Sequence, residues 1–349
     1  MTKILFINPI VREEDSPRHV PYGMALLTAI CDRDGHQVQV YDANAWRLTD
    51  AELYQALQAD NWDVVATGGI TTSYAYIKKI IESAKEFSPQ ALMVVGGGMV
   101  TSMPREIMGF IPGIDLAVIG EAFETLPEIL GKAERGEKDW STVLGVAYRE
   151  ETGKIKLTPP RPLMEDIDVL PYPSWEMYPL DIYWRNSSLL YSEEAFTSKR
   201  RLDINASYGC SLICRFCFHL GIAGDLQHVD GPEGTDVAFT YDRNIRYHSP
   251  SYIVDLVKHA RDNFGIDFVL FLDENLMTMN AHSGWTWLPE IADLWIKEGL
   301  QPKCRREGTP HLETNCDEGV HWGGTSHATL IKPELLKTLY DSGCSQLLY

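Results

Sequence analysis

The chain has 349 residues, a formal net charge of −18 and a sequence pI near 4.9. Hydrophobic residues make up 44% of it and charged residues 23%, which is ordinary for a soluble globular protein. The length is enough for two domains, each with its own core. The acidic balance disfavours nucleic acid as a partner, since phosphate binding requires clustered lysine and arginine. No apolar run approaches the roughly 18 to 20 residues of a membrane helix, so we expect no membrane span. Seven cysteines, and an N-terminus that begins as a strand rather than a targeting peptide, predict a reducing, cytoplasmic location.

Residues 1 to about 130 alternate short apolar strands with amphipathic helices. This pattern predicts an α/β domain with a doubly wound parallel sheet, Rossmann-like, covered by helices on both faces. The expected strands are Ile4–Asn8, Gln37–Tyr41, Val64–Thr67, Leu92–Val95 and Leu116–Ile119. Helices are expected over about residues 23–33 and around residues 77–84, before Pro89.

The loops after the first, third, fourth and fifth strands contain residues that allow a ligand to approach the backbone. They hold Asn8-Pro9, the segments 68–73 and 96–101, and Gly120-Glu121. Ligands of open α/β sheets bind beyond the carboxyl ends of the strands where the strand order reverses, so we expect these loops to line one crevice. No G-x-G-x-x-G follows the first strand, and loop glycines suit a broad, flat ligand that lies against backbone.

The order of these signals resembles the cobalamin-binding domain that precedes many radical S-adenosylmethionine (SAM) domains. The resemblance covers nearly all of residues 1–130 and includes Pro21-Tyr22-Gly23, Asp42, the turn at residues 71–73 and the triple glycine at 96–98. It implies bound cobalamin, in contact with a set of loop residues. These are Asn8, Pro9, Tyr22, Gly23, Thr71, Thr72, Ser73, Gly97, Gly98, Met99, Val100, Gly120 and Glu121.

The D-x-H-x-x-G motif, whose histidine ligates cobalt in cobalamin mutases and methionine synthase, is absent from this chain. His19 lies in the first loop, but its neighbours do not match that motif, which favours a solvent-exposed loop histidine. We therefore expect cobalamin without a lower histidine ligand and with its nucleotide tail in the sheet crevice. The alternative is a Rossmann-like scaffold that holds no cofactor or a different nucleotide.

We assign residues 1–135 to the cobalamin-binding domain, 136–200 to a connector and 201–349 to a second domain. The connector begins with a predicted hairpin, residues 143–149 and 154–157. It continues as a proline-rich path, whose prolines between Pro159 and Pro179 break helices and fix an extended course. Its segment Leu170-Pro171-Tyr172-Pro173-Ser174-Trp175 resembles the interdomain connector of the same combined family.

Three cysteines, Cys210, Cys214 and Cys217, form a CxxxCx(aromatic)C loop with Phe216 as the aromatic residue. A [4Fe–4S] cluster normally takes four cysteines, so three would leave one iron open to a small molecule. Structural zinc is an alternative, with His219 as a fourth ligand, but no second CxxC or HxxxH accompanies the loop. A disulfide is disfavoured in a reducing compartment. The loop resembles the radical SAM signature, which implies that the open iron binds SAM and that Phe216 lies near its adenine.

The second domain is expected to be a partial (β/α) radical SAM barrel. Residues 201–207 are predicted as the first barrel strand, which delivers the cysteine loop at its C-terminal end, where barrel active sites lie. Residues 268–272 are predicted as the second strand, followed by Asp273, Glu274 and Asn275. The resemblance implies that these three residues bind SAM, whereas the alternative is that Asp273 and Glu274 cap a turn. The other expected elements are an irregular insert at 220–249 and helices around 253–260, 285–294 and 333–341.

The last residues, 343–349, resemble the start of a fourth barrel strand. Six strand–helix units are usual for the family, and residues 210–349 supply about half of them. We therefore expect a truncated chain, a fragmentary gene product or one part of a split enzyme, with a C-terminal companion segment as a candidate partner.

Together, the two resemblances imply a cobalamin-dependent radical SAM enzyme. Such an enzyme uses a [4Fe–4S] cluster to cleave SAM to a 5′-deoxyadenosyl radical, and here we expect it to methylate an unactivated carbon. The same cofactors serve ring closure or oxidation in anaerobic porphyrin cyclases, and a non-catalytic cobalamin or iron–sulfur carrier or sensor is a third alternative. The expected partners are a small-molecule or peptide substrate of unidentified class and a reducing electron donor such as flavodoxin or ferredoxin.

Overall fold

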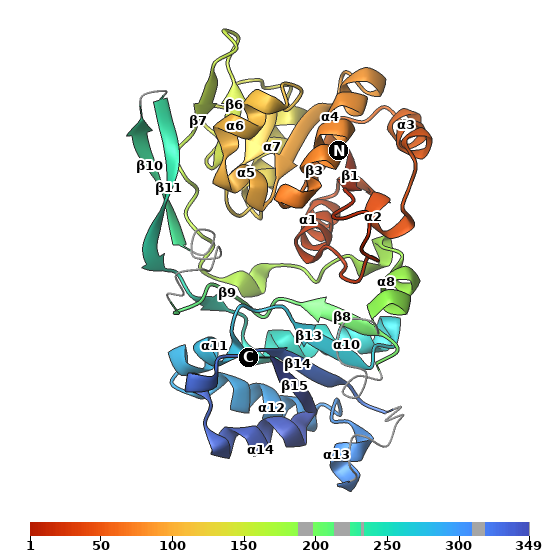
Figure 1. Cartoon of the computed structure of the whole chain (residues 1–349), viewed down its shortest axis with the longest axis vertical. Coiled ribbons are helices and arrows are strands. Elements are labelled where there is room, and N and C mark those ends of the chain that lie inside the picture. The colour runs from red at the N-terminus through yellow and green to blue at the C-terminus, as the bar shows by residue number, and fades with distance from the viewer. Residues whose placement is uncertain (188–197, 213–223, 232–233, 309–317, 349) are drawn as a thin grey trace.

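The computed structural model describes residues 1–187, 198–212, 224–231, 234–308 and 318–348 (Figure 1). It contains two α/β units, one above the other in this view, with the connector running between them. None of the helices in these ranges has the length and apolar character needed to cross a membrane.

The first unit is built on a sheet that, within the described residues, has seven strands in the order β2-β1-β3-β4-β5-β6-β7. The first five pair in parallel and the last two antiparallel. Their bounds are β1 Lys3–Asn8, β2 Gln37–Asp42, β3 Val64–Gly68, β4 Leu92–Gly96, β5 Leu116–Val118, β6 Val146–Arg149 and β7 Ile155–Leu157. The predicted parallel strands are confirmed, and the strand order reverses between β1 and β3, as in doubly wound folds.

Helices cover both faces of this sheet because successive strand residues point to opposite sides. Leu5 and Ile7 of β1 pack in the core with helices α3 and α4, while Ile4 and Phe6 pack in the core with α1 and α7. The helices of this unit are α1 Tyr22–Arg33, α2 Ala43–Trp46, α3 Asp50–Gln58, η1 Thr71–Ser73, α4 Tyr74–Phe87, α5 Gly98–Ser102, α6 Pro104–Phe110 and α7 Thr125–Glu134.

The predicted hairpin forms β6 and β7, and it extends the first sheet. Strand β6 pairs with β5, with Leu116 opposite Tyr148 and Val118 opposite Val146. The rest of the connector contains η2 Ile167–Val169, η3 Trp175–Met177 and α8 Leu180–Ser187. Trp175 is fully buried and belongs to a core cluster that includes Leu26 of α1 and residues of the second unit, so the connector joins the two units through shared packing.

The second unit carries, in the described part of the chain, a parallel sheet of order β15-β14-β13-β8. Its alternation of strands and helices is that of the predicted partial (β/α) barrel. The strands are β8 Arg201–Ile204, β13 Phe268–Phe271, β14 His321–Thr325 and β15 Cys344–Leu348, and a separate pair joins β9 Ser207–Tyr208 to β12 Arg246–Tyr247. The helices are α10 Pro250–Phe264, α11 Leu276–His282, α12 Trp287–Lys297, α13 Lys303–Glu307, η4 Ala328–Leu330 and α14 Pro333–Ser342.

Two features of this unit differ from the sequence-based expectation. The insert expected to be irregular contains an antiparallel hairpin, β10 Gly224–Gly231 and β11 Gly234–Arg243, which lies beside β7 of the first unit (Figure 1). Strand β14 was not expected, because its two glycines have low strand propensity. Packing explains them: a Cβ on Gly323 would lie 2.9 Å from the carbonyl oxygen of Gln346, and one on Gly324 would lie 2.5 Å from Leu276 Cδ1.

Candidate functional site

A cavity of about 530 Å³ opens at the carboxyl ends of β1, β3, β4 and β5. The four loops that follow these strands all line it, so the single crevice expected from the sequence is confirmed. Much of its wall is apolar, with Phe6, Ala66, Val94, Val118 and Leu126 among the lining residues. An apolar, preformed cavity with a few polar groups at its edge is typical of a cofactor site.

Most of the residues expected to contact cobalamin lie at this cavity. Those that line it are Asn8, Pro9, Tyr22, Gly23, Ser73, Gly97, Gly120 and Glu121. The others do not line it: Thr71 and Thr72 are exposed, Gly98 opens α5, and the side chains of Met99 and Val100 are buried in the core shared with α3 and α4.

The glycines of these loops are needed for two different reasons. A Cβ on Gly97, whose φ is +89°, would lie 2.8 Å from the backbone nitrogen and oxygen of Gly69, and one on Gly68 would lie 2.5 Å from the oxygen of Gly96. These glycines therefore allow two loops to pack together, rather than a ligand to approach. Gly23 differs, because a Cβ there would meet no atom within 4 Å. At Gly23 the cavity therefore holds free space beside the backbone, as expected for a glycine that contacts a ligand.

A buried network fixes Asn8 at the edge of the cavity. The side-chain amide of Asn8 donates to Asp42 Oδ1 at 2.7 Å, and the Tyr183 hydroxyl donates to Asp42 Oδ2 at 2.6 Å. Asp42 is fully buried, and this burial raises the pKa of its carboxyl. Because Tyr183 lies on α8, the connector helps to position a residue of the cavity.

His19 also lines the cavity, which the sequence did not indicate. Its Nδ1 contacts Asp203 Oδ2 and lies 3.1 Å from Arg201 Nη2, both on β8. Its side chain is 44% exposed. The expected free loop histidine is therefore a half-exposed residue held against the buried Arg201–Asp203 ion pair of the second unit.

The cysteine loop follows β9 in the second unit. Cys210 is partly buried, and its Sγ lies 4.0 Å from Thr278 Oγ1 of α11. Cys214, Cys217 and Phe216 lie outside the described residues, so the gathering of three thiolates around a cluster stays a prediction. The donor set itself suits iron, because three cysteines within eight residues leave one cluster iron open.

Asp273, Glu274 and Asn275 follow β13, beside the start of the cysteine loop. Buried Asp273 accepts hydrogen bonds from the Ser207 hydroxyl and from the Ala206 backbone nitrogen, the latter at 3.0 Å. Burial raises the pKa of Asp273 to about 7. Asn275 caps α11 by accepting from the backbone of Met277 and Thr278, while Glu274 is exposed. Asp273 thus holds the backbone that leads to Cys210, and contact of these residues with SAM stays a prediction.

The wall of the cavity touches the segment that leads to Cys210. The Tyr22 hydroxyl donates to the carbonyl oxygen of Asn205 at 3.5 Å, and the rings of Phe123 and Tyr208 meet edge to face with centroids 5.9 Å apart. Tyr22 and Phe123 both line the cavity. A ligand in the cavity would therefore lie beside the segment of the chain that leads to Cys210.

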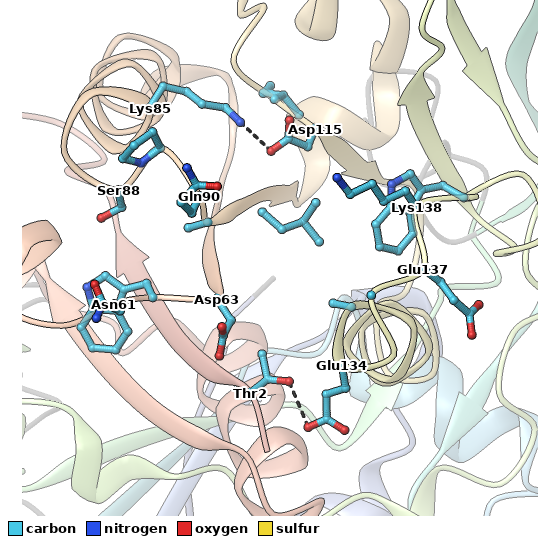
Figure 2. A pocket seen from close by; sticks show the side chains of 18 of the residues that line it. Thr2, Asn61, Asp63, Lys85, Ser88, Gln90, Asp115, Glu134, Glu137 and Lys138 are labelled. Carbon is cyan, nitrogen blue, oxygen red and sulfur yellow. Dashed lines mark hydrogen bonds and ion pairs between the residues drawn. The ribbon is translucent and has the colours of Figure 1, made fainter.

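A larger, polar pocket of about 1200 Å³ lies at the opposite edge of the first sheet, where its strands begin (Figure 2). Its charged groups are largely matched within the chain. Lys85 Nζ lies 2.7 Å from Asp115, and Thr2 donates to Glu134 at 3.1 Å. Among the described residues, neither the segment 207–212 that begins the cysteine loop nor the glycine-rich loops after the strands line it, so the smaller apolar cavity is the stronger candidate site.

Comparison with known proteins agrees with this choice. The family model described as "B12 binding domain" matches residues 10–130. An uncharacterized methyltransferase of Pyrococcus horikoshii is 26% identical over 324 residues, which cover 93% of this chain and 59% of that protein. The cytidylyl-2-hydroxyethylphosphonate methyltransferase of Streptomyces wedmorensis is 22% identical, covering 91% and 65%. The anaerobic magnesium-protoporphyrin IX monomethyl ester cyclase of Rubrivivax gelatinosus is 22% identical, covering 89% and 54%. The chain thus spans between 54% and 65% of the length of these relatives.

Solved structures share the fold over nearly the whole chain. The cobalamin-dependent SAM radical enzyme OxsB, with aqua-cobalamin and SAM bound, aligns with a TM-score of 0.71 at 14% identity, covering 99% of this chain and 43% of that one. The radical SAM methyltransferase TsrM of Kitasatospora setae, with cobalamin and a [4Fe–4S] cluster bound, aligns with a TM-score of 0.66 at 16% identity, covering 99% and 58%.

Proposed function

We propose that the chain is a member of the radical SAM family whose members carry a cobalamin-binding domain, and that it acts as a cobalamin-dependent radical SAM methyltransferase on an unactivated carbon. The match to the B12-binding domain, the shared fold and the curated relatives support this proposal. The observation that carries this proposal is the contact between the two candidate sites. The apolar cavity of the B12-binding domain abuts the segment 205–208, which leads directly to Cys210.

When bound, a [4Fe–4S] cluster and SAM supply a 5′-deoxyadenosyl radical that abstracts hydrogen, and methylcobalamin supplies the methyl group. The chain's own residues hold and enclose these groups. Cys210, Cys214 and Cys217 would hold the cluster. Tyr22, Gly23 and Glu121 would face the cobalamin, and the apolar wall would exclude water from the reacting atoms.

The relatives support methyl transfer most directly, since two of the three described above are named methyltransferases. The relatives named cyclases favour a second candidate, ring closure or oxidation with the same cofactors. The substrate and the electron donor, such as flavodoxin or ferredoxin, remain part of the proposal.

Reductive cleavage of SAM by the anaerobically reconstituted chain tests the function. The chain loaded with cluster and cobalamin is incubated with SAM and a strong reductant, and the products are separated by chromatography. Methyl transfer requires both 5′-deoxyadenosine and S-adenosylhomocysteine. Formation of 5′-deoxyadenosine alone would contradict methylation and favour the cyclase or oxidase. A loaded chain that leaves SAM intact would favour a carrier or sensor, or a chain that is truncated before residues that the reaction needs. The matched control replaces Cys210, Cys214 and Cys217 by alanine, which should abolish both products and leave cobalamin binding intact.

A further inference from the structure

Glu121 in the cavity wall is paired with an arginine of the second unit that the sequence did not single out. Arg246 Nη1 lies 3.0 Å from Glu121 Oε2, and Nη2 contacts Oε1, so the guanidinium grips the carboxylate with two parallel contacts. The same Nη1 donates to the carbonyl oxygen of Met164 in the connector at 2.8 Å. The side chain of Arg246 is 8% exposed and that of Glu121 is 23% exposed. A bidentate, largely desolvated pair of this kind is strong and fixes orientation as well as distance.

Arg246 also contacts the strand that presents the cysteine loop. It lies on β12 directly opposite Tyr208 of β9, and its guanidinium lies over the Tyr208 ring, 5.4 Å from the centroid. The residue that follows β9, Gly209, has a φ of +97°, and a Cβ on it would lie 2.7 Å from the carbonyl oxygen of Asn244. The backbone just before Cys210 is therefore packed closely against the segment that carries Arg246.

A contribution to the stability of the fold does not fully explain why an arginine is buried at position 246. Its Nε is buried and has no hydrogen-bond partner among the described residues. Buried polar groups are nearly always satisfied, so an orphaned donor in such a costly position needs another explanation. The contacts of Arg246 offer such an explanation: its guanidinium touches the cavity wall, the connector and β9 at the same time, so its position links these three parts of the molecule.

We propose that Arg246 is a positioning residue that couples the cavity to the cysteine loop. A ligand that contacts Glu121 alters the geometry of the Glu121–Arg246 ion pair. Because the guanidinium of Arg246 also contacts Tyr208, the same ligand alters the position of Tyr208 and of the backbone before Cys210. The coupling is reciprocal, as binding linkage requires. This inference rests on the proposed function, since it takes cobalamin as the ligand of the cavity. It adds a residue that keeps the two cofactor sites in one relative geometry.

Hydrogen exchange of the backbone amides in residues 204–212, followed by mass spectrometry, tests the coupling. The full chain, purified anaerobically, is measured with and without hydroxocobalamin, and binding is quantified from the visible spectrum. In the wild type, hydroxocobalamin should slow exchange in this peptide about fivefold or more. In Arg246→Gln, hydroxocobalamin should still bind and the slowing should be lost. In Glu121→Gln, the slowing should also be lost when it is measured at a hydroxocobalamin concentration that saturates this variant by its visible spectrum. Arg246→Lys should restore little of it, because an ammonium cannot make the two parallel contacts of a guanidinium.

Arg161→Gln is the matched control. Like Arg246, Arg161 is a partly buried arginine. It lies in the connector, and its side chain pairs with Glu128 and donates to Thr125 of α7 rather than to β9. This variant should keep the wild-type response. If Arg246→Gln, or Glu121→Gln where Arg246→Gln fails to fold, retains the full slowing, the coupling inference is wrong while the proposed function stands. The same holds if wild type binds hydroxocobalamin with no change in residues 204–212. If wild type binds no hydroxocobalamin, the proposed function itself fails, together with the inference that rests on it.

Discussion

At the scale of single residues, the glycines near the cavity have two different roles: some allow loops to pack closely, and others leave space for a ligand. Gly97 adopts a positive φ and packs against Gly69, whereas Gly23 faces open space in the cavity. The sequence placed both among the expected cobalamin contacts, but it could not show which backbone approaches which, because Gly97 and Gly69 belong to loops of different strands. The ion pair of Glu121 escaped the sequence for the same reason, since Arg246 lies 125 residues away along the chain.

Alanine substitutions at these two glycines should therefore affect different properties: Gly97→Ala the stability of the fold, and Gly23→Ala the binding of cobalamin. Gly97→Ala should lower the free energy of unfolding by about 1–3 kcal/mol, because it forces a side chain into a positive φ and against backbone atoms. Gly23→Ala should change it by less than about 1 kcal/mol and weaken hydroxocobalamin binding. Urea unfolding and spectroscopic titration measure the two effects. A Gly23→Ala chain that binds hydroxocobalamin as tightly as wild type would argue against this cavity as the cobalamin site.

Asp273 predicts a pH dependence of stability with a definite sign. Burial raises the pKa of the folded-state carboxyl to about 7, above its value of about 3.9 in an unfolded chain. The native state therefore binds more protons than the unfolded state between these values, and stability from this group falls as pH rises from about 4 to about 7. The difference in unfolding free energy between wild type and Asp273→Asn should shift over this window by an amount on the order of 4 kcal/mol. A difference independent of pH would contradict the buried, protonatable carboxyl.

At the scale of elements, the sequence predicted those strands and helices that are determined by the local pattern of apolar and polar residues. Four of the five parallel strands of the first sheet were predictable because each is a short apolar run that ends in a glycine-rich or polar loop, and the remaining strand, Gln37–Asp42, was predictable from its alternation of polar and apolar residues. The placement of β6 and β7 in the same sheet depends on pairing with β5, which local pattern does not encode. The sequence does carry a signal for the hairpin β10–β11, because Val237, Phe239 and Tyr241 alternate with other residues.

The connector should contribute to the stability of the fold, because it packs into a core that is shared by the two units. Trp175 is fully buried, meets the ring of Phe264 edge to face and belongs to the core cluster that includes α1 and α10. Trp175→Ala should therefore lower the free energy of unfolding by about 3–5 kcal/mol. Trp46→Ala is the matched control, because Trp46 is 46% exposed, and it should change stability by less than about 0.5 kcal/mol. Equal effects of the two substitutions in urea unfolding would show that the connector does not contribute to a shared core.

At the scale of the whole molecule, two sites on different units meet at one interface. The cavity lies where the parallel strands of the first sheet end, and the cysteine loop begins at the segment of the second unit that contacts Tyr22 and Phe123. Each site alone is compatible with a nucleotide scaffold or with a metal site of another kind. Their contact is what favours chemistry that uses both cofactors in one reaction.

The most direct measurement of this claim quantifies iron, acid-labile sulfide, zinc and cobalamin on one sample of the anaerobically reconstituted chain. We expect about four irons and four sulfides per chain, bound together with cobalamin, and loss of the iron but not the cobalamin when Cys210 is replaced by alanine. Stoichiometric zinc without iron, or an iron-loaded chain that binds no cobalamin, would contradict the account.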